Sequence, residues 1–231
     1  MAGKSGERPS ERRPQGTIID EPVEVATWLA QEFGLAAASI DEACERARLE
    51  WATHTEYDPP SLPGTVFWGM CVRFLRMLLV ARAWIQNDTK NFSRIIHPDG
   101  TKAIVVETGD EYTGVRGIKQ PKTKSPKGVE TLAAIEQNIE QTDLFIAPEQ
   151  QLMIAETKRR MLTYFLLVRL ENGVLYRELS LPVGSGESDR IGDWHIRVIL
   201  APMNDGPNPG TQAPLPLPAP DPIISVTRRL A

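Results

Sequence analysis

The sequence is poor in cysteine, with only Cys44 and Cys71 among its 231 residues. A small secreted domain held by disulfides needs several cysteine pairs, and a structural zinc site needs cysteine or histidine at close spacing. Neither pattern occurs. Cys44 lies in an amphipathic stretch and Cys71 in an apolar one. We therefore expect two buried, reduced thiols and a cytoplasmic protein.

Long uninterrupted hydrophobic runs are missing as well. The longest apolar stretch, residues 66–85, is broken by Arg73, Arg76 and Arg82, which makes it a poor membrane-spanning segment. The first 16 residues carry many charges and no apolar block, so we do not expect a secretory signal. The sequence predicts a soluble protein without membrane contact.

Common catalytic and cofactor motifs are also missing. The chain has no GxxxxGK[ST] or GxGxxG phosphate-binding pattern, no HExxH or CxxC metal pattern, and no GxSxG nucleophile elbow. Its net charge of −4 is mild and argues against a protein that binds nucleic acid over its whole surface. We predict no cofactor, no resident metal and no enzymatic activity.

The remaining composition is that of a folded domain with two tails. Hydrophobic residues make up 41% of the chain, which is enough to build a core. Helical patterns come first and strand patterns follow, which predicts a single α+β domain over residues 17–203. We expect residues 1–16 to be a disordered tail, and residues 204–231 to be a proline-rich, extended tail.

Three segments with helical apolar spacing predict N-terminal helices at about residues 22–34, 39–56 and 65–86. In the first, Pro22 suits the first turn and Gly34 a C-terminal cap. In the second, Ser39 and Glu42 fit a capping box, in which the two side chains accept hydrogen bonds from free backbone N–H groups. The third segment is the most apolar, and we expect it to form the central core helix.

The later half of the sequence has the texture of a sheet. β-Branched runs on both sides of Pro98-Asp99-Gly100 predict one hairpin, and Asn172-Gly173 predicts a second. Alternation from Trp194 to Pro202 predicts a last strand. We expect these two hairpins and the last strand to form an antiparallel sheet against the helices, with a further helix over residues 129–141.

The stretch from His97 to Gly114 is the main candidate for an active site. A metal-dependent hydrolase or nuclease built there would use His97, Asp99, Glu107, Asp110 and Glu111, because Mg²⁺ prefers carboxylate oxygens. The acid-x-Lys step of many such nucleases is missing after Glu107. A turn explains Asp99, and solvation at a strand exit explains the later acids. We therefore interpret the stretch as a hairpin with a polar exit, and keep the hydrolase as the alternative.

Residues 114–128, which we call the basic loop, are the most distinctive local feature. Glycine and proline keep them from forming a helix. A cationic loop of this kind can follow a phosphate backbone, and the near absence of aromatic residues predicts binding without sequence specificity. An acidic protein partner, or solvent alone, would suit the same loop. Its candidate polyanion-binding residues are Arg116, Lys119, Lys122, Lys124 and Lys127.

The proline-rich tail is a candidate for protein binding. Its conformation is already restricted, so it loses little entropy on docking, and its apolar end could add a strand to a sheet edge. We predict a non-catalytic adaptor in a larger bacterial assembly, with a protein partner and with nucleic acid as a further ligand. A homo-oligomeric structural protein joined through its tails is another interpretation. The candidate partner-binding residues are Ile223, Ile224, Val226, Arg228 and Arg229.

Overall fold

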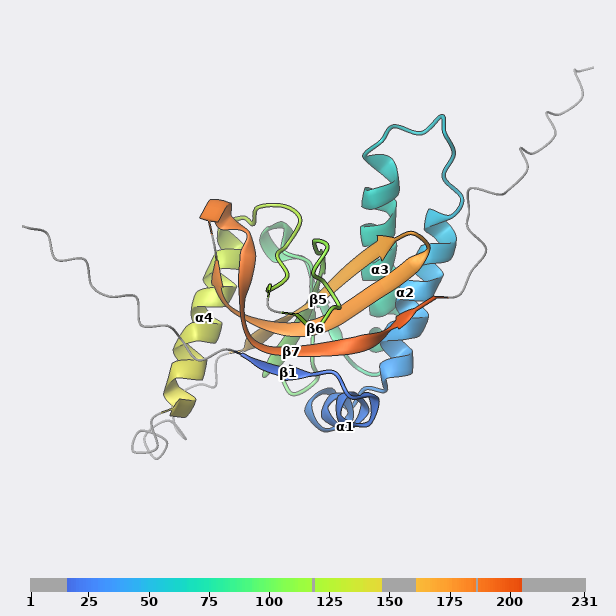
Figure 1. Ribbon diagram of the computed structural model, residues 1–231. Coiled ribbons are helices and arrows are strands. Elements are labelled where there is room, and N and C mark those ends of the chain that lie inside the picture. Colours follow the sequence, from blue (N-terminus) through green and yellow to red (C-terminus); the bar gives the residue numbers. More distant parts are fainter. Residues whose placement is uncertain (1–15, 118, 147–160, 186, 205–231) are drawn as a thin grey trace, which may run out of the picture.

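The computed structural model describes residues 16–117, 119–146, 161–185 and 187–204. Its helices are α1 (Pro22–Phe33), α2 (Ala37–Trp51), α3 (Leu62–Val80) and α4 (Val129–Ile146). Its strands are β1 (Thr17–Ile19), β2 (Ile85–Asn87), β3 (Arg94–Ile96), β4 (Lys102–Thr108), β5 (Leu162–Glu171), β6 (Val174–Ser185) and β7 (Ile191–Met203). The strands form one seven-stranded sheet in the order β1-β7-β6-β5-β4-β3-β2. The first three helices cover one face of this sheet and α4 the other (Figure 1), so the α+β class is confirmed.

The prediction of an antiparallel sheet is wrong, because the sheet is mixed and has more strands than the sequence suggested. β4 and β5 pair in parallel, with Ile104 beside Tyr164, and β1 pairs in parallel with β7. The β4–β5 pair is parallel because α4 crosses the opposite face between the two strands and returns the chain to the same end of the sheet. β1 and β2 have three residues each, too few to show an alternating pattern.

Both predicted hairpins form. Asn172 and Gly173 have φ values of 50° and 78°, and the tightest hairpin turn requires positive φ at both positions. In the first hairpin, the Gly100 N–H donates to the His97 carbonyl at 2.9 Å. Asp99 stabilises this turn, because its Oδ1 accepts from the N–H of Thr101 at 2.8 Å. These turns therefore follow from residue chemistry that is visible in the sequence.

The first helix agrees with the prediction and the second departs from it. Gly34 ends α1 with φ 60°. The capping box is wrong, because Ser39 lies inside α2 and the residue before the helix makes no side-chain capping bond. Leu35 is only 1% exposed, so the chain is fixed in the core before Ser39, and the three alanines that follow favour an early helix start. α2 also ends at Trp51, before the predicted residue 56. Just after its end, the Thr53 hydroxyl donates to the Glu50 carbonyl at 2.7 Å.

The third helix begins and ends earlier than the predicted range 65–86. Pro63 is accepted in its first turn, where a missing N–H costs no hydrogen bond. At the other end Ala83 adopts φ 65°, and Trp84 turns back to stack on Phe33 with ring centroids 6.2 Å apart. Ile85 therefore lies in β2 and not in the helix. The helical spacing of apolar residues continues past Val80 to Ile85, so the sequence pattern did not reveal where the helix ends.

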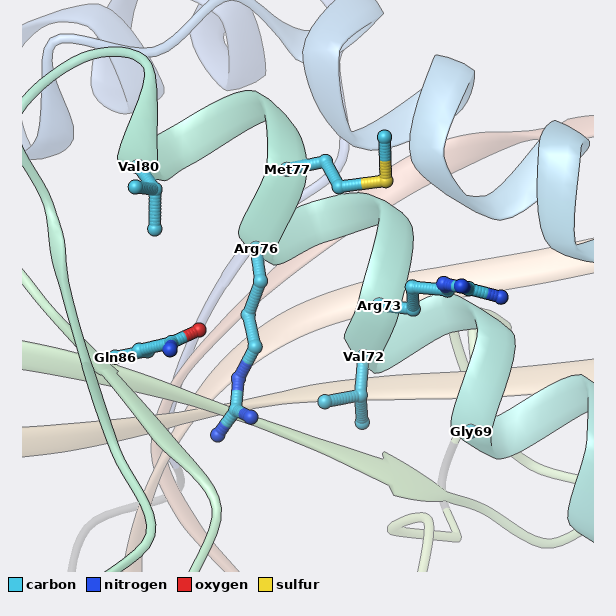
Figure 2. A pocket seen from close by; sticks show the side chains of 7 residues that line it. All are labelled: Gly69, Val72, Arg73, Arg76, Met77, Val80 and Gln86. Atoms are coloured by element: carbon cyan, nitrogen blue, oxygen red, sulfur yellow. The ribbon is translucent and has the colours of Figure 1, made fainter.

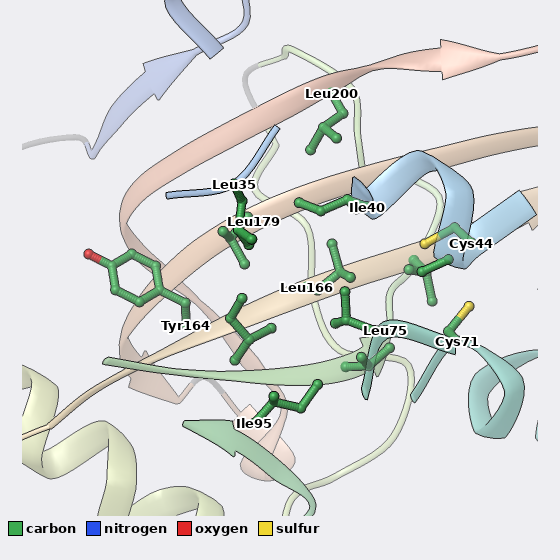
Figure 3. Close-up of a cluster of buried hydrophobic side chains, with 14 of the residues drawn as sticks. Leu35, Ile40, Cys44, Cys71, Leu75, Ile95, Tyr164, Leu166, Leu179 and Leu200 are labelled. Atoms are coloured by element: carbon green, nitrogen blue, oxygen red, sulfur yellow. The ribbon is translucent and has the colours of Figure 1, made fainter. Parts of the chain in front are cut away.

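The main core lies between the first three helices and the sheet (Figure 3). Cys44 from α2 and Cys71 from α3 are both buried and free. Burial raises the pKa of the Cys71 thiol, and the neighbouring Cys44 adds to the rise. α3 buries one stripe, which includes Leu75 and Leu79, and leaves Met77 53% exposed. It is a surface helix and not the central helix that we expected.

The length and hydropathy of α3 would also allow it to cross a membrane, and it is the one described helix of which this is true. A core helix of a protein without any membrane contact can meet the same two criteria.

The opposite face of the sheet has two regions. α4 covers a smaller core in which Ile135 packs with Phe165, Leu167 and Trp194. The adjoining region carries charged and polar side chains, including those of Glu107 on β4 and of Glu178 on β6 and Arg197 on β7. The basic loop lies over this polar region, as the hydrogen bonds below show.

Candidate functional site: a basic loop over the polar face of the sheet

The later part of the basic loop, around Thr123, is tied to the end of β4, the strand that precedes it. Gly109 and Thr123 form an isolated antiparallel bridge. The Asp110 N–H donates to the Lys122 carbonyl at 2.9 Å, and the Lys124 N–H donates to the Thr108 carbonyl at 2.8 Å. The chain between β4 and α4 therefore folds back on itself as a short ladder.

A second set of hydrogen bonds ties the loop to the start of β7. The Thr123 N–H donates to the Ile191 carbonyl at 2.9 Å, and the Ile191 N–H donates back to Thr123 Oγ1 at 3.1 Å. The indole Nε1 of Trp194 donates to the Pro121 carbonyl at 2.8 Å. Thr123 and Pro121 are buried, so this part of the loop belongs to the folded structure.

A buried ion pair holds the beginning of the loop. Arg197 donates from Nε to Glu178 Oε1 at 3.1 Å and from Nη2 to Oε2 at 2.5 Å. Glu178 also accepts from the Gly114 N–H at 3.0 Å and from the Ser180 hydroxyl at 2.9 Å. Arg197 Nη2 donates to the Val115 carbonyl at 3.2 Å. The buried carboxylate and guanidinium thus hydrogen-bond to each other, and both also hydrogen-bond to the backbone of the loop.

Two of the five candidate cations are paired with acids. Arg116 Nη1 lies 2.8 Å from Asp20 Oδ1. Lys127 forms an ion pair with Glu107, and the two side chains are only 11% and 15% exposed. Burial raises the pKa of Glu107, and the charge and hydrogen bond of Lys127 oppose that rise. These two cations therefore have structural partners that the sequence did not suggest.

The other three cations remain at the surface. The Lys119 ammonium donates to the Tyr112 hydroxyl at 3.0 Å, and this hydrogen bond raises the pKa of Lys119. Lys122 and Lys124 are exposed. The stem of Lys122 lies against Gly192, where an added Cβ would be 2.9 Å from its Cγ. Within the described residues, no ion pair or hydrogen bond engages the ammonium groups of Lys122 and Lys124.

The candidate acids of the alternative interpretation divide into two groups at the two ends of β4. At one end His97 Nδ1 lies 2.8 Å from Asp99 Oδ1. Burial tends to raise the pKa of Asp99, but hydrogen bonds from Thr101 and the contact with His97 outweigh it and lower the pKa to about 2. His97 also packs edge-on against Trp84, with ring centroids 4.8 Å apart. These contacts are those of a stabilised turn.

At the other end of β4, Glu107 is engaged by Lys127, and Asp110 Oδ1 accepts from the Tyr112 N–H at 3.1 Å. Glu111 is exposed. In the part of the chain that the structure describes, no three His, Cys, Asp or Glu side chains are grouped so that they could hold a metal ion. The structure thus brings His97 and Asp99 together but keeps both away from the other three acids.

The partner-binding residues predicted in the C-terminal tail, Ile223, Ile224, Val226, Arg228 and Arg229, lie outside the described residues, as does most of the predicted N-terminal tail.

Sequence reasoning missed the charged residues that hold the loop in place. Glu178 and Arg197 are 0% and 1% exposed, and they lie in β6 and β7. A second buried arginine, Arg177, lies 2.6 Å from Asp41 on α2. The sequence does contain charged residues within the strand patterns around residues 174–185 and 191–203. Charged side chains are buried only when they are paired, so these residues were the available signal for buried ion pairs.

No protein family model, no curated protein and no solved structure matches this chain. The interpretation of the basic loop therefore rests on its own geometry.

Proposed function

We propose that this protein is a non-catalytic binding component of a larger assembly, and that its basic loop binds a polyanion such as a nucleic-acid backbone. The observation that supports this proposal is the exposure of Lys119, Lys122 and Lys124 on a loop whose backbone is hydrogen-bonded at Gly114, Thr123 and Lys124. Lysine is a compact, hydrated charge without a fixed binding geometry, so such a surface contacts phosphates and not base edges. Binding is then independent of nucleotide sequence.

The hydrogen bonds at the base of the loop favour binding. A segment that is already ordered loses less conformational entropy when it meets its ligand. Arg116 and Lys127 contribute less than the three exposed lysines, because contact with phosphate would compete with Asp20 and Glu107. We therefore assign the binding to three cations and not to the five that the sequence suggested.

The test is fluorescence anisotropy with a labelled duplex of random sequence, titrated from low to high salt. Three phosphate contacts give a slope of log K against log [salt] of about −2.7, since each contributes about −0.9. Replacing Lys119, Lys122 and Lys124 with glutamine should abolish binding. The melting temperature should not change, because the exposed ammonium groups support no buried contact.

The matched control replaces three cations on the other side of the sheet with glutamine: Arg46 of α2, Arg73 of α3 and Arg82, which follows α3. It removes the same net charge and should leave most of the binding intact. Wild-type protein that does not bind at low salt, or a triple lysine variant that binds normally, would contradict the proposal.

The adaptor role, the cytoplasmic location and the bacterial origin belong to the same proposal. Affinity capture of the full chain from its native host, followed by mass spectrometry of bound proteins and nucleic acid, checks the adaptor role. Recovery of the chain alone would contradict an adaptor role.

A further inference from the structure

α3 carries an exposed apolar surface on the side of the sheet opposite the basic loop. Met77 and Val80 are 53% and 45% exposed. Isolated exposed apolar side chains are common, but adjacent ones beside a concave surface mark interaction sites. A pocket of about 570 Å³ lies here, lined by one flank of α3 and by Gln86 of β2.

The shape of this groove suits a helix. Figure 2 shows Val72, Arg76 and Val80 projecting from α3 toward the side on which Gln86 lies. They are spaced by four residues and so form a ridge, and Gly69 lies beside its N-terminal end. Ridges of this spacing pack into the grooves of another helix, and a glycine lets that helix come close. From Val72 to Val80 the ridge is roughly 12 Å long at 1.5 Å per residue, enough for about two turns of a partner.

The charge of the groove suits an acidic partner. α3 contains no aspartate or glutamate, and two arginines line the groove. Arg76 is bound by Asp88, at 3.1 and 2.6 Å. Arg73 is exposed, and its guanidinium contacts the Met70 sulfur at 3.9 Å, which leaves its charge available to a carboxylate.

We propose that this groove binds an amphipathic helix of a partner protein, with an apolar contact on Met77 and Val80 and a carboxylate on Arg73. A second copy of this chain fits less well, because two-fold symmetry would bring two arginine-bearing α3 helices together. The proposal is independent of the basic loop, so failure of either one leaves the other intact.

The test is selection from a displayed library of helical peptides on the immobilised full chain. The variant with Met77→Gln and Val80→Gln serves as the counter-target. Both side chains are exposed, so the variant should fold and melt like the wild type. Peptides specific for the wild type should carry apolar residues at helical spacing next to Asp or Glu. Their affinity should fall about tenfold or more with Met77→Gln and Val80→Gln, and also with Arg73→Gln, the range for a central contact.

A control variant with Val23→Gln and Leu49→Gln changes apolar residues that are 79% and 57% exposed on α1 and α2, and should keep the affinity. Neutral or basic selected peptides, or no peptide specific for the wild type, would overturn the proposal. A wild-type dimer in light scattering that Met77→Gln and Val80→Gln dissociates would assign the groove to a second copy. Sedimentation with phosphatidylglycerol vesicles that the same changes abolish would assign it to a membrane. Either result overturns the proposal.

Discussion

Glu178 and Arg197 face each other from neighbouring strands in an ion pair whose side chains are 0% and 1% exposed. The same pair hydrogen-bonds to the backbone of Gly114 and Val115. It therefore connects β6, β7 and the beginning of the basic loop. A buried charge that loses its partner is far more costly than a pair that is removed as a whole.

We accordingly expect Glu178→Ala to lower the free energy of unfolding by about 3–5 kcal/mol, because it leaves the Arg197 guanidinium buried and uncompensated. The double variant with Glu178→Leu and Arg197→Met should cost less than the sum of the single changes. Urea denaturation of Glu178→Leu, of Arg197→Met and of the double variant measures this coupling. Glu42→Ala is the control, since its contact with Arg46 is exposed and 3.6 Å long and should contribute about 0–1 kcal/mol. Additive costs would show that the two charges do not interact.

Leu75 and Met77 lie on opposite sides of α3, with exposed fractions of 1% and 53%. Leu75→Ala should lower the free energy of unfolding by about 2–5 kcal/mol, since it leaves a cavity in the main core. Met77→Ala should change it by about 0.5 kcal/mol or less. Thermal and chemical denaturation compare the two. Similar losses for both variants would mean that the outer flank of α3 is buried in solution, for example by a second copy of the chain.

Gly109 begins the turn into the basic loop, and a Cβ there would lie 1.8 Å from Thr113 Oγ1. Gly109→Ala should therefore cost about 1–3 kcal/mol through overpacking. Adding Thr113→Ala removes the closest atom and should restore part of the loss. Gly117→Ala is the matched control, because no atom lies within 4 Å of its Cβ position. A Gly109→Ala variant as stable as the control would show that this turn adjusts freely.

Asp99 should titrate with a pKa of about 2, below its ordinary value of 3.8. Because the folded pKa is the lower one, the carboxylate stabilises the fold above about pH 4, and this contribution is lost as the pH falls from about 4 to 2. Carboxyl ¹³C chemical shifts across that range measure the midpoint. Thr101→Ala removes the hydroxyl that donates to Asp99 at 2.8 Å and should raise the pKa of Asp99. A wild-type midpoint near 3.8 would mean that these hydrogen bonds do not persist in solution.

Local residue chemistry was enough to predict the helical half, the two hairpins and the last strand. Gly34 ends a helix and Asn172-Gly173 makes a tight turn because of their own backbone preferences, whatever surrounds them. The same is true of Asp99, whose side chain bonds the backbone two residues later. The basic loop was also visible, because lysine, glycine and proline in one short segment exclude a helix and a core strand.

Strand order and charge pairing were decided only when distant segments came together. Arg116 meets Asp20 across 96 residues of sequence, and Arg197 meets Glu178 across 19. The spacing of residues in the sequence does not reveal such pairs, because the pattern is the same whether a charged side chain faces water or a buried partner. The parallel β4–β5 pair likewise depends on α4 crossing the sheet. The early end of α3 depends on the packing of Trp84 against Phe33. These outcomes follow from packing between segments, which local preference does not encode.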